Sequence, residues 1–433
     1  MKDYAVQVFN KRMLLVHSSL LLAAAVMGFA PGSEAGATFK IDDTKWISVG
    51  TGIKTRFSAA EDRAGRAGAE KYSTDFALDN LRLYVNGQVH KYIKFTFNTE
   101  CANCTAGGDI RILDGIAQFE FNPFVNVWLG RQLVPEGRLE LNGPFYSEVF
   151  EPYKVPFEPS DSTIQFVLPG PDAGTFGRDE GVNFWGAALN GHLKYVFGIF
   201  EGLKRSNFST GNSTANVDGN LLYAGRIAYN ILNEEKAPGY YTGGTAYGAD
   251  GDVLTVAGFA QYQEDGAGSF TNPGNFLLAG GDFHFEKVFA DKGVVTFNAE
   301  YKNFGISYAN GAPTPGGADT FIVGGGGGGL TNGFQGDSIT GDLLYLIPKK
   351  IWIGQLQPYV RYTEVFTRDG VSVPGKFDQS EYEAGVNYII DGHNARVSLF
   401  WQGGDLTNGG SIFTPAANGN FVNAIKLGVQ LQI

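Results

Sequence analysis

The sequence predicts an all-β protein, a transmembrane antiparallel β-barrel of about 16 strands with one long loop folded inward. Three observations predict this fold. Large apolar residues alternate with polar ones in many short segments, as in strands that have one apolar and one polar face. An apolar segment of the export type begins the chain. Finally, the connections between predicted strands alternate between short and long, which is typical of bacterial outer-membrane barrels.

The first 37 residues have the features of a secretory signal peptide. Three basic residues lie among the first twelve, residues 13–30 are mostly apolar, and Ala35-Gly36-Ala37 matches an A-x-A cleavage site. We therefore expect a signal peptide at 1–37 and a barrel domain at 38–433, with cleavage after Ala35 as one alternative and a retained anchor as another. Later apolar stretches are shorter than the roughly 20 residues of a spanning helix, so any membrane crossing must use the strands of a closed barrel.

The C-terminal segment shows the strand pattern most clearly. Ile425, Leu427, Val429, Leu431 and Ile433 share one face, and Lys426, Gly428, Gln430 and Gln432 share the other. The same alternation places Ile47, Val49 and Ile53 opposite Ser48, Gly50 and Lys54 in the first strand. In chain order the predicted strands are 45–57, 76–89, 91–100, a segment ending at 121, 125–131, 179–189, 192–202, 219–231, 252–263, 275–287, 292–304, 335–346, 356–367, 377–390, 393–402 and 420–433.

The connections support a barrel with both termini on one side. Asn190-Gly191 and Asp391-Gly392 predict tight hairpin turns, and other short connections lie near 89–91, 122–124 and 288–291. Long connections, such as 132–178 and 305–334, alternate with them. The connection 232–251 departs from this rule because it is long where a short turn is expected. A soluble sandwich or propeller is the alternative fold, but sandwiches have more even loops and propellers repeat a blade sequence, which this chain does not.

The composition limits the partners. The chain has 433 residues and a net charge of −11. Without the signal segment the chain has 30 basic and 42 acidic residues, a net charge of −12. This negative charge argues against nucleic acid as a partner, because phosphate binding needs a basic surface. The sequence has no H-E-x-x-H motif and no other pattern that assigns a catalytic residue, so we expect no enzymatic activity, no metal and no cofactor.

Cys101 and Cys104 are the only cysteines of the chain. A haem attachment motif would need His at position 105, which is Thr105, and a zinc site would need further ligands. An exported protein meets an oxidising compartment, so we expect a small loop disulfide. Free thiols and a metal or redox role are the alternatives.

Segment 132–178 is the longest connection and the candidate pore constriction. It carries seven acidic residues against three basic ones, and seven prolines that we expect to oppose helix or strand formation. An acidic loop inside a pore favours cations, whereas an external lid would leave permeation unaffected. The candidate constriction residues are Glu136, Arg138, Glu140 and Glu148.

Polar faces of the predicted strands carry both signs of charge, as expected of a water-filled lumen. The candidate lumen-lining residues are Lys54, Arg56, Arg82, Lys94, Arg361 and Arg396. Opposite charges on the wall also stabilise the barrel, so we expect most of them to act in structure more than in selectivity. The tryptophans Trp46, Trp128, Trp185, Trp352 and Trp401 are interpreted as part of the aromatic girdles at the membrane interfaces.

Four short blocks resemble the phosphate-selective porin O and P family. They are FALDNLRLYVNGQV (76–89), VWLGRQ (127–132), GVNFWG (181–186) and YEAGVNYIIDGHNAR (382–396). The resemblance implies a sixteen-stranded outer-membrane porin, commonly a homotrimer, with water-filled pores. Selective members of that family have a ladder of Arg and Lys at the constriction, whereas the corresponding loop here is acidic on balance. The chain also ends in Ile433, where many outer-membrane barrels end in an aromatic residue.

These features predict a porin channel for the passive diffusion of small hydrophilic solutes or ions across the bacterial outer membrane. Its expected partners are outer-membrane lipid, the permeating solutes and two further copies of the chain. One alternative is a phosphate- or anion-selective porin. Another is a barrel that serves as a sheath or anchor for a partner such as an electron-transfer protein, which would need a wide lumen free of the inward loop. The sequence leaves the solute, the ion preference and the oligomeric state open.

Overall fold

The computed structural model describes residues 36–61, 72–102, 110–152, 177–202, 216–269, 272–310, 336–367, 379–404 and 421–433. They belong to one compact unit, Gly36–Ile433. The predicted signal peptide lies outside the described residues except for its last two positions, so its cleavage stays a prediction.

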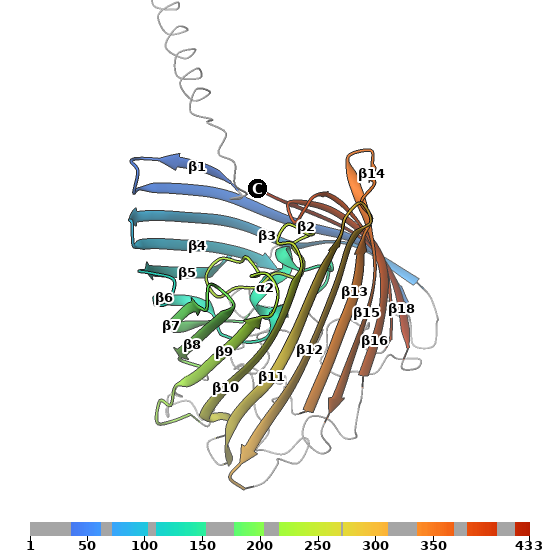
Figure 1. Cartoon of the computed structure of the whole chain (residues 1–433). Coiled ribbons are helices and arrows are strands. Elements are labelled where there is room, and N and C mark those ends of the chain that lie inside the picture. Colours follow the sequence, from blue (N-terminus) through green and yellow to red (C-terminus); the bar gives the residue numbers. More distant parts are fainter. Residues whose placement is uncertain are drawn as a thin grey trace, which may run out of the picture. The chain divides into compact units, whose positions relative to one another are not determined.

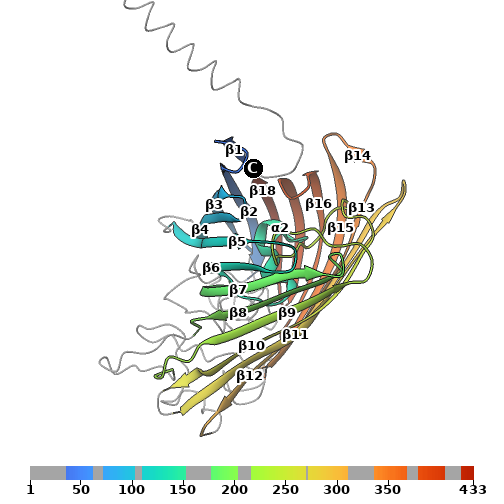
Figure 2. The same cartoon turned by 60° about the vertical axis from the view of Figure 1, so that its left-hand side comes forward.

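Sixteen antiparallel strands form a closed ring, which confirms the predicted barrel (Figures 1 and 2). The last strand pairs with the first one, from Ala424 opposite Ala60 to Gln432 opposite Gly52, and this pairing closes the ring. The ring consists, in order, of β2 (Trp46–Glu61), β3 (Tyr72–His90), β4 (Ile93–Ala102), β5 (Arg111–Glu120), β6 (Asn126–Leu133), β7 (Arg178–Ala188), β8 (Leu193–Phe200), β9 (Leu222–Asn230), β10 (Val253–Ser269), β11 (Asn272–Phe289), β12 (Gly293–Tyr308), β13 (Gly336–Leu346), β15 (Gly354–Thr367), β16 (Gln379–Asp391), β17 (Ala395–Gly404) and β18 (Val422–Gln432).

Two short strands lie beside the ring and were not expected as separate elements. β1 (Ala37–Lys40) pairs with the start of β2, and β14 (Lys350–Ile351) pairs with the start of β15. The predicted hairpins at Asn190-Gly191 and Asp391-Gly392 are confirmed by the pairing of β7 with β8 and of β16 with β17. Asn190 and Gly191 have φ angles of 56° and 88°, the left-handed conformation that tight hairpin turns require.

The two faces of the strands have the predicted polarity. On β18, Ile425, Leu427 and Leu431 are exposed on the exterior, whereas Gln430 is fully buried inside the ring. The same exterior exposure of large apolar side chains recurs from β2 to β17. A soluble protein rarely exposes so much continuous apolar surface, so this exterior is that of a barrel that spans a membrane. Among the described residues, no helix combines the length and the apolar character needed to cross a membrane.

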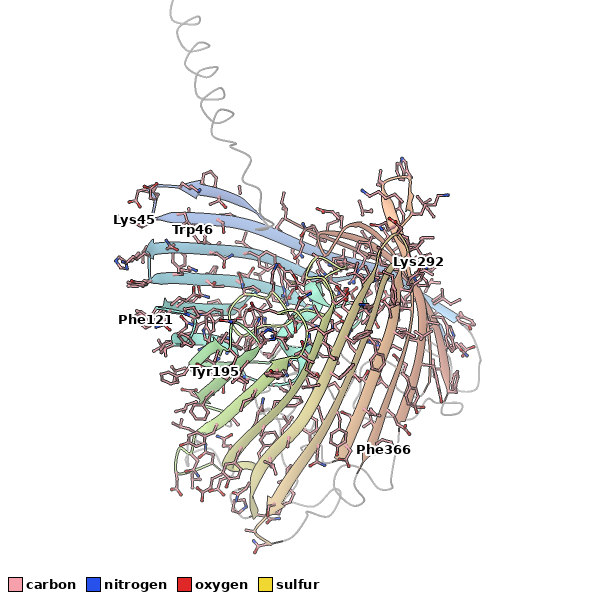
Figure 3. All side chains as sticks on the ribbon, in the orientation of Figure 1. Lys45, Trp46, Phe121, Tyr195, Lys292 and Phe366 are labelled. Carbon is pink, nitrogen blue, oxygen red and sulfur yellow. The ribbon has the colours of Figure 1, made fainter. Side chains whose placement is uncertain are left out.

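Aromatic side chains lie exposed near both ends of the ring, as interface girdles require (Figure 3). Phe121 follows β5 at one end, and Phe366 lies near the end of β15 at the other. The girdle interpretation is wrong for Trp128 and Trp185. Trp128 is 2% exposed and packs inside the barrel against Tyr240 and Tyr241. The ring of Trp185 packs against that of Trp128, with ring centres 5.5 Å apart. The reason is strand parity, because Trp128 shares the inner face of β6 with Asn126 and Gln132.

Candidate pore constriction

The segment after β6 folds into the ring, as predicted for the long loop. Residues 133–145 are all buried, and the helix α2 (Arg138–Tyr146) lies within the ring of strands (Figures 1 and 2). The expectation that prolines oppose helix formation is wrong at this place. Gly143 has a φ of 65° and interrupts the helix just before Pro144, so that proline does not have to fit a continuous helical hydrogen-bond ladder. Residues 153–176 of the loop lie outside the described residues.

Glu136 and Glu140 converge on one lysine of the wall. Lys302 on β12 contacts Glu140 at short range, Glu136 at 3.3 Å and Glu300 at 3.2 Å. All four side chains are buried. Burial raises the pKa of Glu136 and raises that of Glu140 well above its usual value; Lys302 opposes this rise and Glu300 adds to it. Because the pKa values of Glu136 and Glu140 are raised, these two side chains add less negative charge to the lumen than the sequence suggests.

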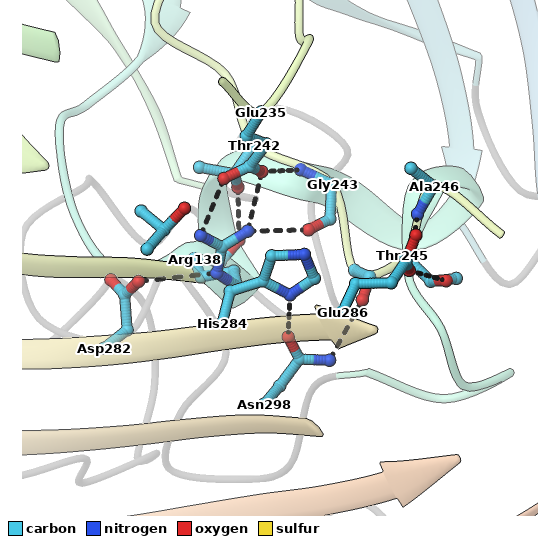
Figure 4. Close-up of polar contacts among 12 residues, drawn as sticks. Arg138, Glu235, Thr242, Gly243, Thr245, Ala246, Asp282, His284, Glu286 and Asn298 are labelled. Atoms are coloured by element: carbon cyan, nitrogen blue, oxygen red, sulfur yellow. Dashed lines mark hydrogen bonds and ion pairs between the residues drawn. The ribbon is translucent and has the colours of Figure 1, made fainter. Parts of the chain in front are cut away.

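Arg138 joins α2 to the connection between β9 and β10 (Figure 4). Its guanidinium donates to both oxygens of Glu235, at 2.7 and 2.9 Å, and to the carbonyl of Gly243 at 2.8 Å. Asp282 on β11 lies 3.4 Å from Arg138 Nε. Burial by itself would raise the pKa of Glu235, but the contact with Arg138 outweighs burial and keeps that pKa below its usual value. This pair is therefore a fully charged, bidentate ion pair inside the barrel.

Glu148 is also buried, between the wall and the β9–β10 connection. Its backbone carbonyl accepts a hydrogen bond from Asn387 at 3.0 Å. A Cβ atom added at Gly244 would lie 1.7 Å from a carboxylate oxygen of Glu148, so only glycine fits at this approach. The four candidate constriction residues thus lie inside the barrel in contact with other side chains or backbone. Whether they border the narrowest point of a water path stays a prediction.

Most of the candidate lumen-lining bases bind the inward loop. Lys54 donates to the carbonyls of Pro144 and Phe150, at 3.0 and 2.5 Å. Arg396 donates to the carbonyls of Ser147 and Val149, at 2.8 and 3.1 Å. Because the end of α2 and the chain after it leave backbone carbonyls without helical partners, these bases satisfy acceptors that would otherwise be buried alone.

The other four bases differ in their contacts. Arg361 donates to the Glu151 carbonyl at 2.8 Å, and Arg56 contacts the Glu151 carboxylate at 3.0 Å. Arg82 pairs with Glu100 on β4 and lies 5.2 Å from the centre of the Phe145 ring. Lys94 pairs with Glu120 at 2.6 Å and is the most exposed of the six, at 34% of its side chain. Five of these six side chains thus contact the loop, whereas their role in lining a water path stays a prediction.

Solved porin structures resemble the chain over nearly its whole length. OprB of Pseudomonas putida is 9% identical, with a TM-score of 0.57 over 89% of this chain and 94% of that one. The anion-selective porin of Comamonas acidovorans is 12% identical, with a TM-score of 0.52 over 90% and 100%. OmpT of Vibrio cholerae in its trimer form is 12% identical, with a TM-score of 0.50 over 90% and 100%. The chain has the fold of an outer-membrane porin.

No protein-family model and no curated protein sequence matches the chain. The resemblance to the phosphate-selective O and P family is therefore not confirmed, and the porin fold rests on the solved structures. At this low identity the neighbours establish the architecture of the porin barrel alone.

The porin barrel contains a second inward segment within residues 232–251, the connection that is long where a short turn is expected. Tyr240 and Tyr241 of this segment pack against Trp128, with ring centres 5.3 and 5.5 Å apart. A cavity of about 230 Å³ remains between the segment and the wall, bordered by Trp185, Lys194 and Arg226 among others. The anomalous length was the one signal in the sequence, since no motif marks the segment.

Cys101 lies near the end of β4. Cys101 is completely buried and disulfide-bonded. Cys104 lies outside the described residues, so the predicted pairing of the two is not placed and stays a prediction.

Proposed function

We propose that the protein is an outer-membrane porin that lets small hydrophilic solutes or ions diffuse passively through a charge-balanced lumen. The supporting observation is the closed ring with an apolar exterior, a polar inner wall and an inward-folded loop. In this proposal the signal peptide 1–37 is removed, the domain 38–433 forms the barrel, and three copies assemble. The trimer form named for OmpT of Vibrio cholerae supports the last point.

We expect weak selectivity with a small preference for cations. The loop 132–178 has seven acidic residues against three basic ones, which favours cations. However, Glu136 and Glu140 are buried with raised pKa values, and the inward bases offset the remaining acids. The preference should weaken further as salt rises, because exposed charges are screened over about 8–10 Å at physiological ionic strength.

The two alternatives have less support. A phosphate-selective pore needs free cationic side chains at the constriction, whereas Lys54, Arg361 and Arg396 are engaged with loop carbonyls. A sheath for another protein needs an empty lumen, whereas residues 133–152 and the part of 232–251 between Glu235 and Gly248 contact each other and the inner wall inside the described part of the ring.

Reversal potentials of the purified protein in a planar bilayer under a KCl gradient test the proposal. We expect open channels and a small potential of the sign for cation preference. A strong anion preference, or block of chloride current by low concentrations of phosphate, would show that the inward bases control permeation. Absence of any channel activity would contradict the porin proposal itself.

A further inference from the structure

The connection between β9 and β10 lies on the side of the ring where all other described connections are short. Strands alternate in direction, so this connection shares its side with the turns at Asn190-Gly191 and Asp391-Gly392. In outer-membrane barrels the short turns face the periplasm. Residues 232–251, here named the β9–β10 segment, therefore enter the lumen from the side opposite to the loop that carries α2.

The β9–β10 segment is bound to the barrel wall at several points. Glu286 on β11 accepts hydrogen bonds from the Thr245 hydroxyl at 2.6 Å and from the Gly248 N–H at 2.6 Å. Asn298 on β12 donates to the Gly244 carbonyl at 3.0 Å (Figure 4). Glu286 and Asn298 are buried, so these bonds form away from bulk water and fix the segment to the wall.

The same segment is also bound to α2. The Thr242 hydroxyl donates to the Arg138 carbonyl at 2.8 Å, and the Gly244 N–H donates to the Tyr146 carbonyl at 3.0 Å. With the bidentate pair of Arg138 and Glu235, the contacts extend from the beginning of α2 to its end. The loop from one side and the segment from the other thus form one packed unit.

We propose that the β9–β10 segment is a second constriction element, which narrows the channel from the periplasmic side and positions α2 through Glu235. The inference rests on the proposed porin function. Glu235 is a positioning residue, because it acts on permeating solutes through Arg138 and α2. It also sets the charge of the lumen, since it neutralises an arginine that is 2% exposed.

Single-channel recordings of three forms test this inference. In the first, a short Gly-Ser turn replaces residues 233–251; in the second, Glu235→Gln removes the negative charge; in the third, Glu234→Gln is the matched control. Glu234 is the neighbouring carboxylate, 43% exposed and paired with Lys194 at 3.5 Å. Heat-modifiable migration in gels confirms that each form has folded.

Replacement of the segment should raise the single-channel conductance by roughly twofold or more, because the width of a pore controls its flux. Glu235→Gln should shift the reversal potential toward anions, because Arg138 loses its main counter-charge, whereas Glu234→Gln should not. A role limited to stability would leave the reversal potential unchanged. If wild-type channels are open and the replacement variant has the same conductance, the second constriction is contradicted while the porin proposal stands. If neither form conducts, the porin proposal itself is contradicted. If only the replacement variant conducts, the segment closes the wild-type channel completely, which supports the inference.

Discussion

Single residues in the lumen join elements that are distant in the sequence, and His393 is one of them. It lies in the turn between β16 and β17, where its Nε2 is 2.9 Å from the carbonyl of Thr245 in the β9–β10 segment. Its ring packs 4.9 Å from that of Tyr247 and 5.5 Å from that of Tyr146 at the end of α2. Burial first, and then the nearby charge of Arg396, lowers the pKa of His393 to about 4.

This pKa shift predicts a loss of stability in acid. An unfolded chain binds a proton at His393 near pH 6.5, whereas the folded protein resists protonation until about pH 4. Stability should therefore fall as pH falls through that window, by up to about 3 kcal/mol from this group. The raised pKa values of Glu136 and Glu140 act in the opposite direction, so the comparison must be made between variants.

Thermal melting of wild type and His393→Gln across pH 7 to pH 4 measures this effect. The glutamine variant should lose less stability on acidification, because it has no group to protonate. The exposed residue His90 at the end of β3 provides the control, and His90→Gln should behave like wild type. Equal acid sensitivity in all three proteins would exclude His393 as the responsible group.

At the scale of elements, glycines in the wall make room for the inward loop. Phe150 lies against Gly428 on β18, where an added Cβ would be 2.5 Å from its ring, and Phe145 lies against Gly52 on β2, at 2.8 Å. Both rings are at most 1% exposed. The close approach of a phenyl ring to a strand backbone therefore requires the absence of a side chain, and both glycines lie on the inner face of their strands.

Gly428→Val should displace the loop from the wall. The overlap with Phe150 should reduce stability by about 1–3 kcal/mol and make the channel conductance larger or noisier. Gly258→Val on β10 is the matched control, because the nearest atom to an added Cβ there is 3.9 Å away. Denaturation midpoints and single-channel conductances are measured for both variants. If Gly428→Val and Gly258→Val have the same midpoint and the same conductance, the packing role of Gly428 is contradicted.

At the scale of the whole molecule, closure of the ring determines stability. Ile433 and Thr51 exchange two backbone hydrogen bonds of 2.9 Å, which extend the pairing of β18 with β2 that closes the barrel. Each strand of the ring has a partner on both sides, which leaves no edge within the membrane.

We therefore expect a heat-modifiable protein in the outer-membrane fraction. The unboiled protein should migrate faster in a denaturing gel than the boiled one, because the closed barrel resists detergent, and a slower band should report any trimer. Circular dichroism should show mainly β-structure. A spectrum dominated by helix, or recovery of the mature protein from the soluble periplasm, would contradict the barrel.

The alternation of apolar and polar residues by itself determined the number of strands, their order and the face on which Lys54 or Arg361 lies. That information is local, because successive side chains of a strand point to opposite faces. The anomalous length of 232–251 was also visible in the sequence, as was the excess of acids in the loop 132–178.

Only the tertiary structure decided which charges meet. Lys302 and Glu140 are 162 positions apart, and Arg138 and Glu235 are 97 apart, so no local pattern could pair them. Trp128 was likewise predicted as a girdle residue, whereas in the structure it packs against Tyr240 inside the barrel. The physical reason is that contacts with many strands of the ring fix the position of an inward segment. That position then decides which opposite charge lies close enough to pair with a buried charged side chain.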